Sequence, residues 1–151
     1  MIQPLNLPKA PLKLSRKDEV VFVWCEIRKK KLQLTPEEWV RQHVIHFLIQ
    51  ENNVPLGVIA SEQAIQVNGL LRRCDLVIYN QSGKPIVLVE CKAPDVKLTE
   101  KVVYQIAQYN SKLNVDYLLI TNGIEHYYCY INRQTNAIQY LENLPDWNEI
   151  A

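Results

Sequence analysis

The stretch Ile86-Val87-Leu88-Val89-Glu90-Cys91-Lys92 decides how this chain folds. Its four consecutive apolar residues predict a strand that is covered on both faces, as at the centre of a sheet. Side chains alternate along a strand, so Glu90 and Lys92 leave one face and Cys91 leaves the other. Charges at a buried strand end are expensive unless they are paired or hold a metal. Two interpretations therefore stand side by side: the two charges neutralise each other, or they belong to a functional site.

The segments around this strand predict one α/β domain with a central mixed sheet flanked by helices. Thr35-Pro36-Glu37-Glu38 is a capping box that begins a helix running to about residue 50. A second helix is expected from Leu98 or Thr99 to Leu113. Asn68-Gly69 predicts a tight turn between two strands. Further strands are expected at 20–27, 58–67, 70–79, 117–121, 126–131 and 137–141.

Length and composition limit what the chain can be. With 151 residues it fits a single domain and leaves no room for an ATPase motor. We expect an irregular arm over residues 1–19, which are rich in proline and basic residues, and one domain over 20–151. No apolar run approaches the roughly 20 residues of a membrane helix, so no membrane partner is expected. The four cysteines are widely spaced and no secretory signal is evident, which predicts reduced thiols in a cytoplasmic protein.

The net charge of +1 neither indicates nor excludes a nucleic-acid partner, because a local basic face would suffice. The run Arg28-Lys29-Lys30-Lys31 has two interpretations. It is either a solvated loop or a patch that contacts phosphates.

Asp75 strengthens the case for a site at Glu90 and Lys92. It lies at the entry to the strand before the central one, and a turn centred near Ser82 pairs it with about Val89 or Glu90. Asp75 and Glu90 would then both reach one cation. Two carboxylates suit Mg²⁺, which keeps several waters and uses one or two carboxylates with substrate phosphate. A lysine beside such a site could orient the attacking water or stabilise negative charge.

The two helices offer further candidates, each with a simpler alternative. Glu37 lies at the edge of the apolar stripe of the first helix, where Glu38 does not, and Glu37 could add a third carboxylate. Alternatively, both glutamates only serve the cap and the helix dipole. Gln105 and Tyr109 share one face of the second helix, a pair that packing alone could explain. His43 and His46 have no third ligand in view, so we expect them to be surface or packing residues.

The ordered set Asp75, Glu90-x-Lys92 and Gln105-x-x-x-Tyr109, preceded by a helical glutamate, resembles the PD-(D/E)xK nuclease superfamily. More narrowly, the chain is similar to the N-terminal nuclease domain of type I restriction enzyme R subunits, in its free-standing bacterial form. The stretches that carry this narrower resemblance, within about residues 20–130, are Ile27-Arg28-Lys29-Lys30, Leu34 to Gln42, Arg73-Cys74-Asp75, Val89 to Pro94 and Thr121-Asn122-Gly123. The chain departs from the superfamily pattern at Cys74, where the superfamily name records a proline.

The resemblance implies a restriction-endonuclease-like core and Mg²⁺-dependent hydrolysis of DNA phosphodiesters, with Mn²⁺ as a substitute. It implies that Asp75 and Glu90 bind the metal, that Glu37 supports it and that Lys92 is catalytic. Gln105 and Tyr109 would position the site or the DNA backbone. The candidates for contact with nucleic acid are Arg28, Lys29, Lys30, Arg41, Arg73 and Tyr109.

The resemblance also implies partners, because in restriction enzymes this domain works with a motor and with specificity subunits. A small domain that cuts both strands would need to dimerise, so a homodimer is a further expectation. Two other functions stay open at this stage. One is a nucleic-acid-binding or partner-binding module without hydrolysis, and the other is a nuclease directed at RNA.

Overall fold

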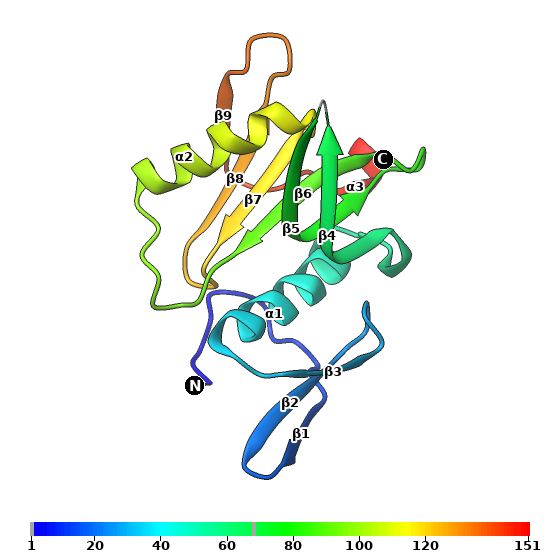
Figure 1. Cartoon of the computed structure of the whole chain (residues 1–151), viewed down its shortest axis with the longest axis vertical. Coiled ribbons are helices and arrows are strands. Elements are labelled where there is room, and N and C mark those ends of the chain that lie inside the picture. The colour runs from blue at the N-terminus through cyan, green and yellow to red at the C-terminus, as the bar shows by residue number, and fades with distance from the viewer. Residues whose placement is uncertain (1, 68) are drawn as a thin grey trace.

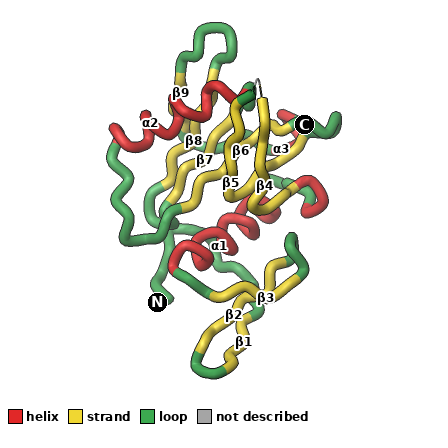
Figure 2. The backbone as a smooth tube through the Cα atoms, in the orientation of Figure 1, coloured by secondary structure: helices red, strands yellow, loops and turns green. Residues whose placement is uncertain are grey.

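The computed structural model describes residues 2–67 and 69–151, which form two β-sheets and three α-helices (Figures 1 and 2). The helices are α1 (Pro36–Glu51), α2 (Glu100–Asn110) and α3 (Trp147–Ile150), and short 3₁₀ turns span Leu56–Val58 and Ser111–Leu113. The strands are β1 (Leu14–Lys17), β2 (Val20–Cys25), β3 (Lys30–Gln33), β4 (Ile59–Val67), β5 (Leu70–Tyr79), β6 (Pro85–Cys91), β7 (Tyr117–Thr121), β8 (His126–Ile131) and β9 (Ile138–Leu141).

The larger sheet is mixed, as predicted, with the strand order β4-β5-β6-β7-β8-β9. Strands β6 and β7 run parallel, and α2 lies in the connection between them. The other neighbouring strands of this sheet pair antiparallel. The stretch that predicted a central strand forms β6, whose residues from Ile86 to Cys91 are all buried. The predicted turn at Asn68-Gly69 falls partly on residue 68, which lies outside the described residues.

The N-terminal segment corrects two sequence predictions. Residues 1–19 were expected to be irregular, but β1 forms within them, and β3 begins at Lys30 within the basic run for which a solvated loop was one interpretation. Both strands pair antiparallel with β2 and make a separate three-stranded sheet in the order β1-β2-β3. The apolar strand β2 thus gains a hydrogen-bonding partner on each side, which composition alone did not reveal in such short polar segments.

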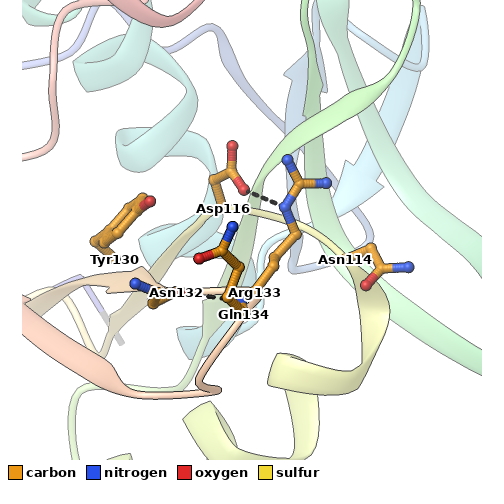
Figure 3. Close-up of a pocket in the computed structure, with 6 residues that line it drawn as sticks. All are labelled: Asn114, Asp116, Tyr130, Asn132, Arg133 and Gln134. Atoms are coloured by element: carbon orange, nitrogen blue, oxygen red, sulfur yellow. Dashed lines mark hydrogen bonds and ion pairs between the residues drawn. The ribbon is translucent and has the colours of Figure 1, made fainter.

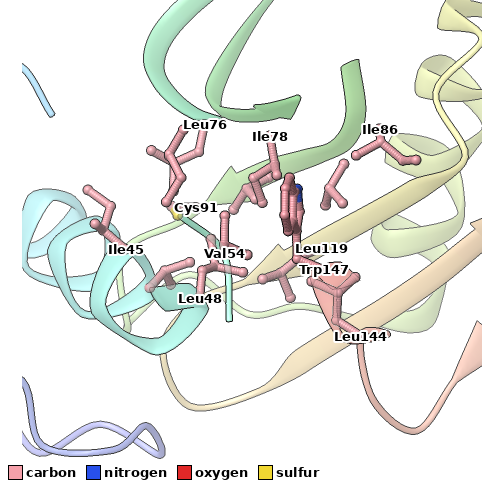
Figure 4. Packing of buried hydrophobic residues seen from close by; sticks show 14 of the residues in the cluster. Ile45, Leu48, Val54, Leu76, Ile78, Ile86, Cys91, Leu119, Leu144 and Trp147 are labelled. Atoms are coloured by element: carbon pink, nitrogen blue, oxygen red, sulfur yellow. The ribbon is translucent and has the colours of Figure 1, made fainter. Parts of the chain in front are cut away.

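Two apolar clusters cover the two faces of the larger sheet. One cluster packs between the sheet and α1 and includes the buried side chains shown in Figure 4, such as Ile45, Leu48, Leu76 and Leu119. The other packs beneath α2 and includes Val103, Ala107, Leu88 and Leu118. The central strands are therefore covered on both sides, as their composition predicted.

Helix α1 is enclosed more completely than a one-sided apolar stripe would suggest. It begins at the predicted cap, where the Thr35 hydroxyl accepts a hydrogen bond from the Glu38 amide at 3.1 Å. One side packs on the larger sheet, while Cys25 and Leu32 of the small sheet join the same cluster. The N-terminal arm covers another side, since the Trp39 indole donates to the Gln3 carbonyl at 2.9 Å. This enclosure explains why polar residues of α1 are buried together with its apolar ones.

The turn between β5 and β6 is closed by Asn80. Its side-chain oxygen accepts hydrogen bonds from the amides of Ser82 and Lys84, at 2.9 and 3.0 Å. Its backbone amide donates to the Lys84 carbonyl at 2.8 Å. Gly83 takes a φ of +77°, a conformation that glycine adopts without a steric penalty. The turn therefore has a defined length, which sets the register of the two strands that carry Asp75 and Glu90.

The four cysteines are free and buried, as expected for reduced thiols. Within residues 2–67 and 69–151, no helix is both long enough and apolar enough to cross a lipid bilayer.

Candidate active site

Asp75 lies where the regular alternation of β5 is interrupted. Cys74 belongs to the cluster beneath α2, and Leu76, two residues later, belongs to the cluster beneath α1. Across β4, the position opposite Asp75 is Glu62, whose φ is +53°. Irregularities of this kind re-aim side chains and are common beside active sites. Here the irregularity lets Asp75 reach the face of the sheet that α1 covers.

The register confirms the predicted position of Asp75 across from the end of β6. Leu76 pairs with Val89, so Asp75 comes next to Glu90 on the neighbouring strand. Its Oδ2 accepts a hydrogen bond from the Cys91 amide at 2.8 Å, and its Oδ1 accepts one from Arg41 Nη2 at 3.0 Å. Burial, with the Asp75 charge beside it, raises the pKa of the Cys91 thiol well above its ordinary value. The thiol is therefore neutral, and the charged groups here are Asp75 and Arg41.

The glutamate of α1 that is buried beside Arg41 is Glu38 rather than Glu37, which corrects the buried stripe predicted from helical periodicity. Glu38 is 6% exposed and accepts hydrogen bonds from Arg41 and from the Gln42 amide group, the latter at 2.8 Å. The Glu37 side chain is 47% exposed and lies 3.7 Å from Arg41 Nη2. The reason is the enclosure of α1, which buries the face of Glu38, Arg41 and Gln42 as well as the apolar face.

Arg41 is the centre of this buried group. Burial by itself lowers its pKa, but the carboxylates of Glu38 and Asp75 outweigh that effect and raise the pKa above its ordinary value. The guanidinium therefore stays charged while 7% exposed. It joins the helix to the sheet at the strand end where the predicted site lies.

Glu90 faces the opposite side of the sheet, toward α2. It lies two residues after Leu88, which packs beneath α2, and it forms an ion pair with Arg72 of β5. The Arg72 guanidinium carbon lies 5.1 Å from the centroid of the Tyr109 ring. Arg72, Gln105 and Tyr109 line one cavity of about 270 Å³ with Val102 and Ile106. The structure therefore brings together four residues, Glu90, Arg72, Gln105 and Tyr109. Gln105 and Tyr109 had been selected from the sequence by their helical spacing, which packing alone could also explain.

Lys92 follows the end of β6 and is half-buried. Its backbone amide donates to the Thr121 carbonyl at 2.8 Å, which continues the parallel pairing by one residue. Among the described residues its ammonium has no hydrogen bond or ion pair. The next loop is held by Asn122, which donates to the Val96 carbonyl at 2.9 Å and accepts from the amides of Ile124 and Glu125. The backbone of Lys92 is thus held in place, while its ammonium has no partner among the described residues.

The residues expected to contact nucleic acid differ in how free they are. Arg28 and Arg73 both lie near the Glu62 carboxylate, at 2.9 and 3.8 Å. Lys30 is exposed, and Lys29, also exposed, lies 3.7 Å from the Glu26 carboxylate. Arg41, in contrast, is enclosed by its carboxylate partners as described above.

A divalent cation is implied by the resemblance, and the donor chemistry is compatible with it. Asp75 and Glu90 supply hard carboxylate oxygens from adjacent strands, but their side chains leave opposite faces of the sheet, and Glu90 Oε1 is paired with Arg72. Within the part of the chain described, no three His, Cys, Asp or Glu side chains converge as metal ligands. The two carboxylates instead have arginine partners, Arg41 and Arg72.

Another cavity lies away from these residues. It has a volume of about 610 Å³ and is lined by residues of β8, of the turn after it and of the segment before β7 (Figure 3). Its main charged contact is the ion pair between Arg133 Nε and Asp116 Oδ1, at 2.9 Å. None of the predicted site residues lines this cavity, so it is not part of the candidate site.

A protein-family model described as the type I restriction enzyme R protein N terminus (HSDR_N) matches residues 36–145. The chain belongs to this family. The match begins at α1 and ends after β9, so it includes Asp75, Glu90, Lys92 and the candidates on the helices but not Arg28, Lys29 or Lys30. No curated protein sequence matches the chain.

One similar solved structure is a fragment of a putative HsdR subunit of a type I restriction enzyme from Vibrio vulnificus. It shares 20% sequence identity with this chain, with a TM-score of 0.40. The match covers 60% of this chain and 19% of the other, so this HSDR_N chain spans only a minor part of the other chain's length.

Three residues of the site were missed from sequence. Glu38 was set aside because it falls outside the apolar stripe, Gln42 was not considered, and Arg72 was not singled out beside Arg73. For Glu38 and Gln42 a signal was present in the sequence, because their spacing from each other and from Arg41 places the three side chains together on one face of a helix. It could not be recognised without knowing that a second sheet and the N-terminal arm enclose the helix.

Proposed function

We propose that this HSDR_N domain is a Mg²⁺-dependent nuclease with a restriction-endonuclease-like core that hydrolyses DNA phosphodiester bonds. The observation that carries the proposal is the junction of β5 and β6. Asp75 bonds to the Cys91 amide at 2.8 Å, with Glu90 directly before that amide and Lys92 directly after it. Family membership supports a nuclease-like role for this junction.

In this proposal Asp75 and Glu90 would hold the cation, which Mn²⁺ could replace, once both side chains turn from their arginine partners toward the strand end that they share. When bound, the metal supplies positive charge to the phosphate and to the attacking water. Arg41 and Arg72, which now pair with these carboxylates, would balance the negative charge of the substrate. Glu38 and Gln42 position Arg41 and act through it, while Glu37 is at the exposed edge of the same group.

Lys92 is the proposed catalytic residue, because it directly follows the Cys91 amide that Asp75 binds and it makes no ion pair among the described residues. It would orient the attacking water and stabilise negative charge that develops on the phosphate. Gln105 and Tyr109 would position the DNA backbone at the cavity that they share with Arg72. Arg28, Lys29, Lys30 and Arg73 would contact phosphates outside it.

A cleavage assay tests this function. The purified protein is incubated with supercoiled, linear, single-stranded and branched DNA and with RNA, in Mg²⁺, Mn²⁺ or EDTA. We expect metal-dependent cutting of DNA that is lost in Lys92→Ala and retained in Lys84→Ala, since Lys84 is exposed in the distant turn. Equal cutting by Lys92→Ala would refute the role of Lys92, and preferential cutting of RNA would identify an RNA-directed nuclease instead.

The arginine partners favour a second candidate, a nucleic-acid-binding module without hydrolysis. Both carboxylates are already neutralised, as they would be if they served only to hold the fold together. Such a module would bind DNA equally in Mg²⁺ and in EDTA and would cut nothing. In that case a motor or specificity subunit, or a second copy of the chain, would be sought as the activating partner.

A further inference from the structure

Positive charge is concentrated in the small sheet. Residues 9–33 carry eight lysines and arginines against three acidic residues, whereas the rest of the chain has nine against thirteen. The nearly neutral chain is therefore divided into a basic segment and an acidic remainder. The basic segment contains β1, β2 and β3, which extend away from the larger sheet on the far side of α1 (Figure 1).

The register of this sheet places an aromatic residue between two lysines. Trp24 pairs with Lys31 on one side, and its backbone amide donates to the Lys13 carbonyl on the other, at 3.0 Å. One step along β2, Phe22 pairs with Ser15 and Gln33. Directly paired residues share a face, so the two rings and their polar neighbours form a single surface.

This surface faces away from the protein core. Val23 and Cys25, which alternate with the two rings along β2, are completely buried. Phe22 and Trp24 are only half-buried and join neither apolar cluster. Lys31 is exposed and the Lys13 side chain is 75% exposed, although Lys13 Nζ lies 3.5 Å from Glu26. We call this surface, formed by Lys13, Ser15, Phe22, Trp24, Lys31 and Gln33, the outer face of the small sheet. The Glu26 carboxylate lies beside it and partly neutralises Lys13 and Lys29.

Accessible rings flanked by lysines fit an unpaired nucleic-acid strand. Bases of a single strand stack on aromatic side chains while nearby lysines contact the backbone phosphates. In a duplex the bases are stacked on one another, so rings on a sheet surface cannot reach them. The combination of charge and rings therefore favours a single strand over a duplex.

The outer face is also connected to the candidate active site. The turn between β2 and β3 is tied to β4 by Arg28, whose Nη1 lies 2.9 Å from Glu62 Oε2. Glu62 lies across from Asp75. A strand held on the small sheet would thus approach the site from the side of β4 and β5.

We propose that the outer face of the small sheet binds single-stranded DNA, with bases stacked on Trp24 and Phe22 and phosphates on Lys13 and Lys31. The binding itself does not require hydrolysis. Only the further step, that the bound strand is the one to be cut, rests on the proposed nuclease function.

Fluorescence anisotropy with the full chain in EDTA tests the binding. The probes are a labelled 20-nucleotide single-stranded DNA, the duplex of the same sequence and the equivalent RNA. We expect the single-stranded DNA to bind most tightly. Trp24→Leu should weaken its binding roughly tenfold, which corresponds to the loss of one stacked base. Tyr140→Leu, which removes an exposed ring of β9, is the matched control and should bind normally.

The lysines are tested by salt dependence. Lys13→Gln with Lys31→Gln should lower the slope of log affinity against log salt by about 1.4, at roughly 0.7 for each phosphate contact on a single strand. The charge-matched control is Lys84→Gln with Lys112→Gln, both exposed and outside the small sheet. These exposed substitutions keep the test decisive even if Trp24→Leu fails to fold, as circular dichroism would reveal.

Tighter binding of the duplex or the RNA, or equal salt slopes for the two lysine pairs, would overturn the proposal. Failure of the nuclease function is seen separately, since binding is measured without metal and cleavage is measured with Lys92→Ala. If DNA is cut equally well by a Trp24→Leu variant that no longer binds a single strand, the bound strand is not the substrate.

Discussion

Arg41→Met tests whether the buried charge group between α1 and the sheet stabilises the fold. In the native protein one guanidinium lies against the carboxylates of Glu38 and Asp75 and is 7% exposed. Removing it leaves a buried and a partly buried carboxylate whose remaining donors, among the described residues, are the Gln42 side chain and the Cys91 amide. Breaking a buried pair from one side costs about 3–5 kcal/mol, because the remaining charge is uncompensated.

A loss of that size is large beside the roughly 5–15 kcal/mol that stabilises an ordinary domain. At about 2–4 °C per kcal/mol for a chain of this length, it lowers the Tm by about 6–20 °C. Urea unfolding followed by tryptophan fluorescence measures the change in free energy, and an unchanged m-value shows that the unfolded state is the same. Arg133→Met is the matched control, because its ion pair with Asp116 is largely exposed and such pairs contribute about 0–1 kcal/mol.

The double variant Glu38→Gln with Arg41→Met separates charge from packing. Neutralising Glu38 removes one of the two uncompensated carboxylates, so the double variant should be more stable than Arg41→Met alone. A coupling of about 1–3 kcal/mol is expected for groups in one network. A loss in Arg41→Met no greater than in Arg133→Met, or a coupling near zero, would refute this account of the buried charge group.

Three further predictions concern the fold. Thr35→Ala removes the acceptor for the Glu38 amide and should cost about 1 kcal/mol in the free energy of unfolding, measured with urea; no change would mean that water replaces the cap. Gly123→Ala should cost about 1–3 kcal/mol, because φ is +87° and the new Cβ would lie 2.8 Å from Leu5 Cδ2; an unchanged Tm would contradict this. Burial lowers the pKa of His46, opposed by Glu26, so the unfolded chain takes up its proton first as pH falls. The free energy of unfolding should therefore fall as pH drops below about 6.5, and it should fall less in His46→Gln. Equal slopes of this free energy against pH in wild type and variant would exclude His46 as the cause.

The elements that could be predicted from the sequence are those whose own residues favour one type of secondary structure. The apolar run of β6, the capping box of α1 and the strand Tyr117–Thr121 were all identified, because burial on both faces and a specific cap leave few alternatives. β1 and β3 were missed because short polar strands exist only through pairing with β2, which is a property of the fold and not of their own residues.

In the candidate site, too, features set by local sequence could be predicted and features set by tertiary contacts could not. The position of Asp75 across from the end of β6 followed from the length of one turn, so it could be predicted. The choice of Glu38 over Glu37, and the arginine partners of Asp75 and Glu90, depend on how α1 and α2 pack against the sheet. Such tertiary contacts leave no periodic signal in the sequence.

The Asn80 turn has a consequence for how this family can change over time. Asp75 and Glu90 lie on one hairpin, so their relative placement depends on the length of a turn that touches neither of them. A single inserted residue that slips the register of β6 by one would bring Cys91 to the face of Glu90 and Glu90 to the apolar face beneath α1. Natural variation should therefore tolerate substitutions in this turn but select against changes in its length, even though the turn contacts neither carboxylate.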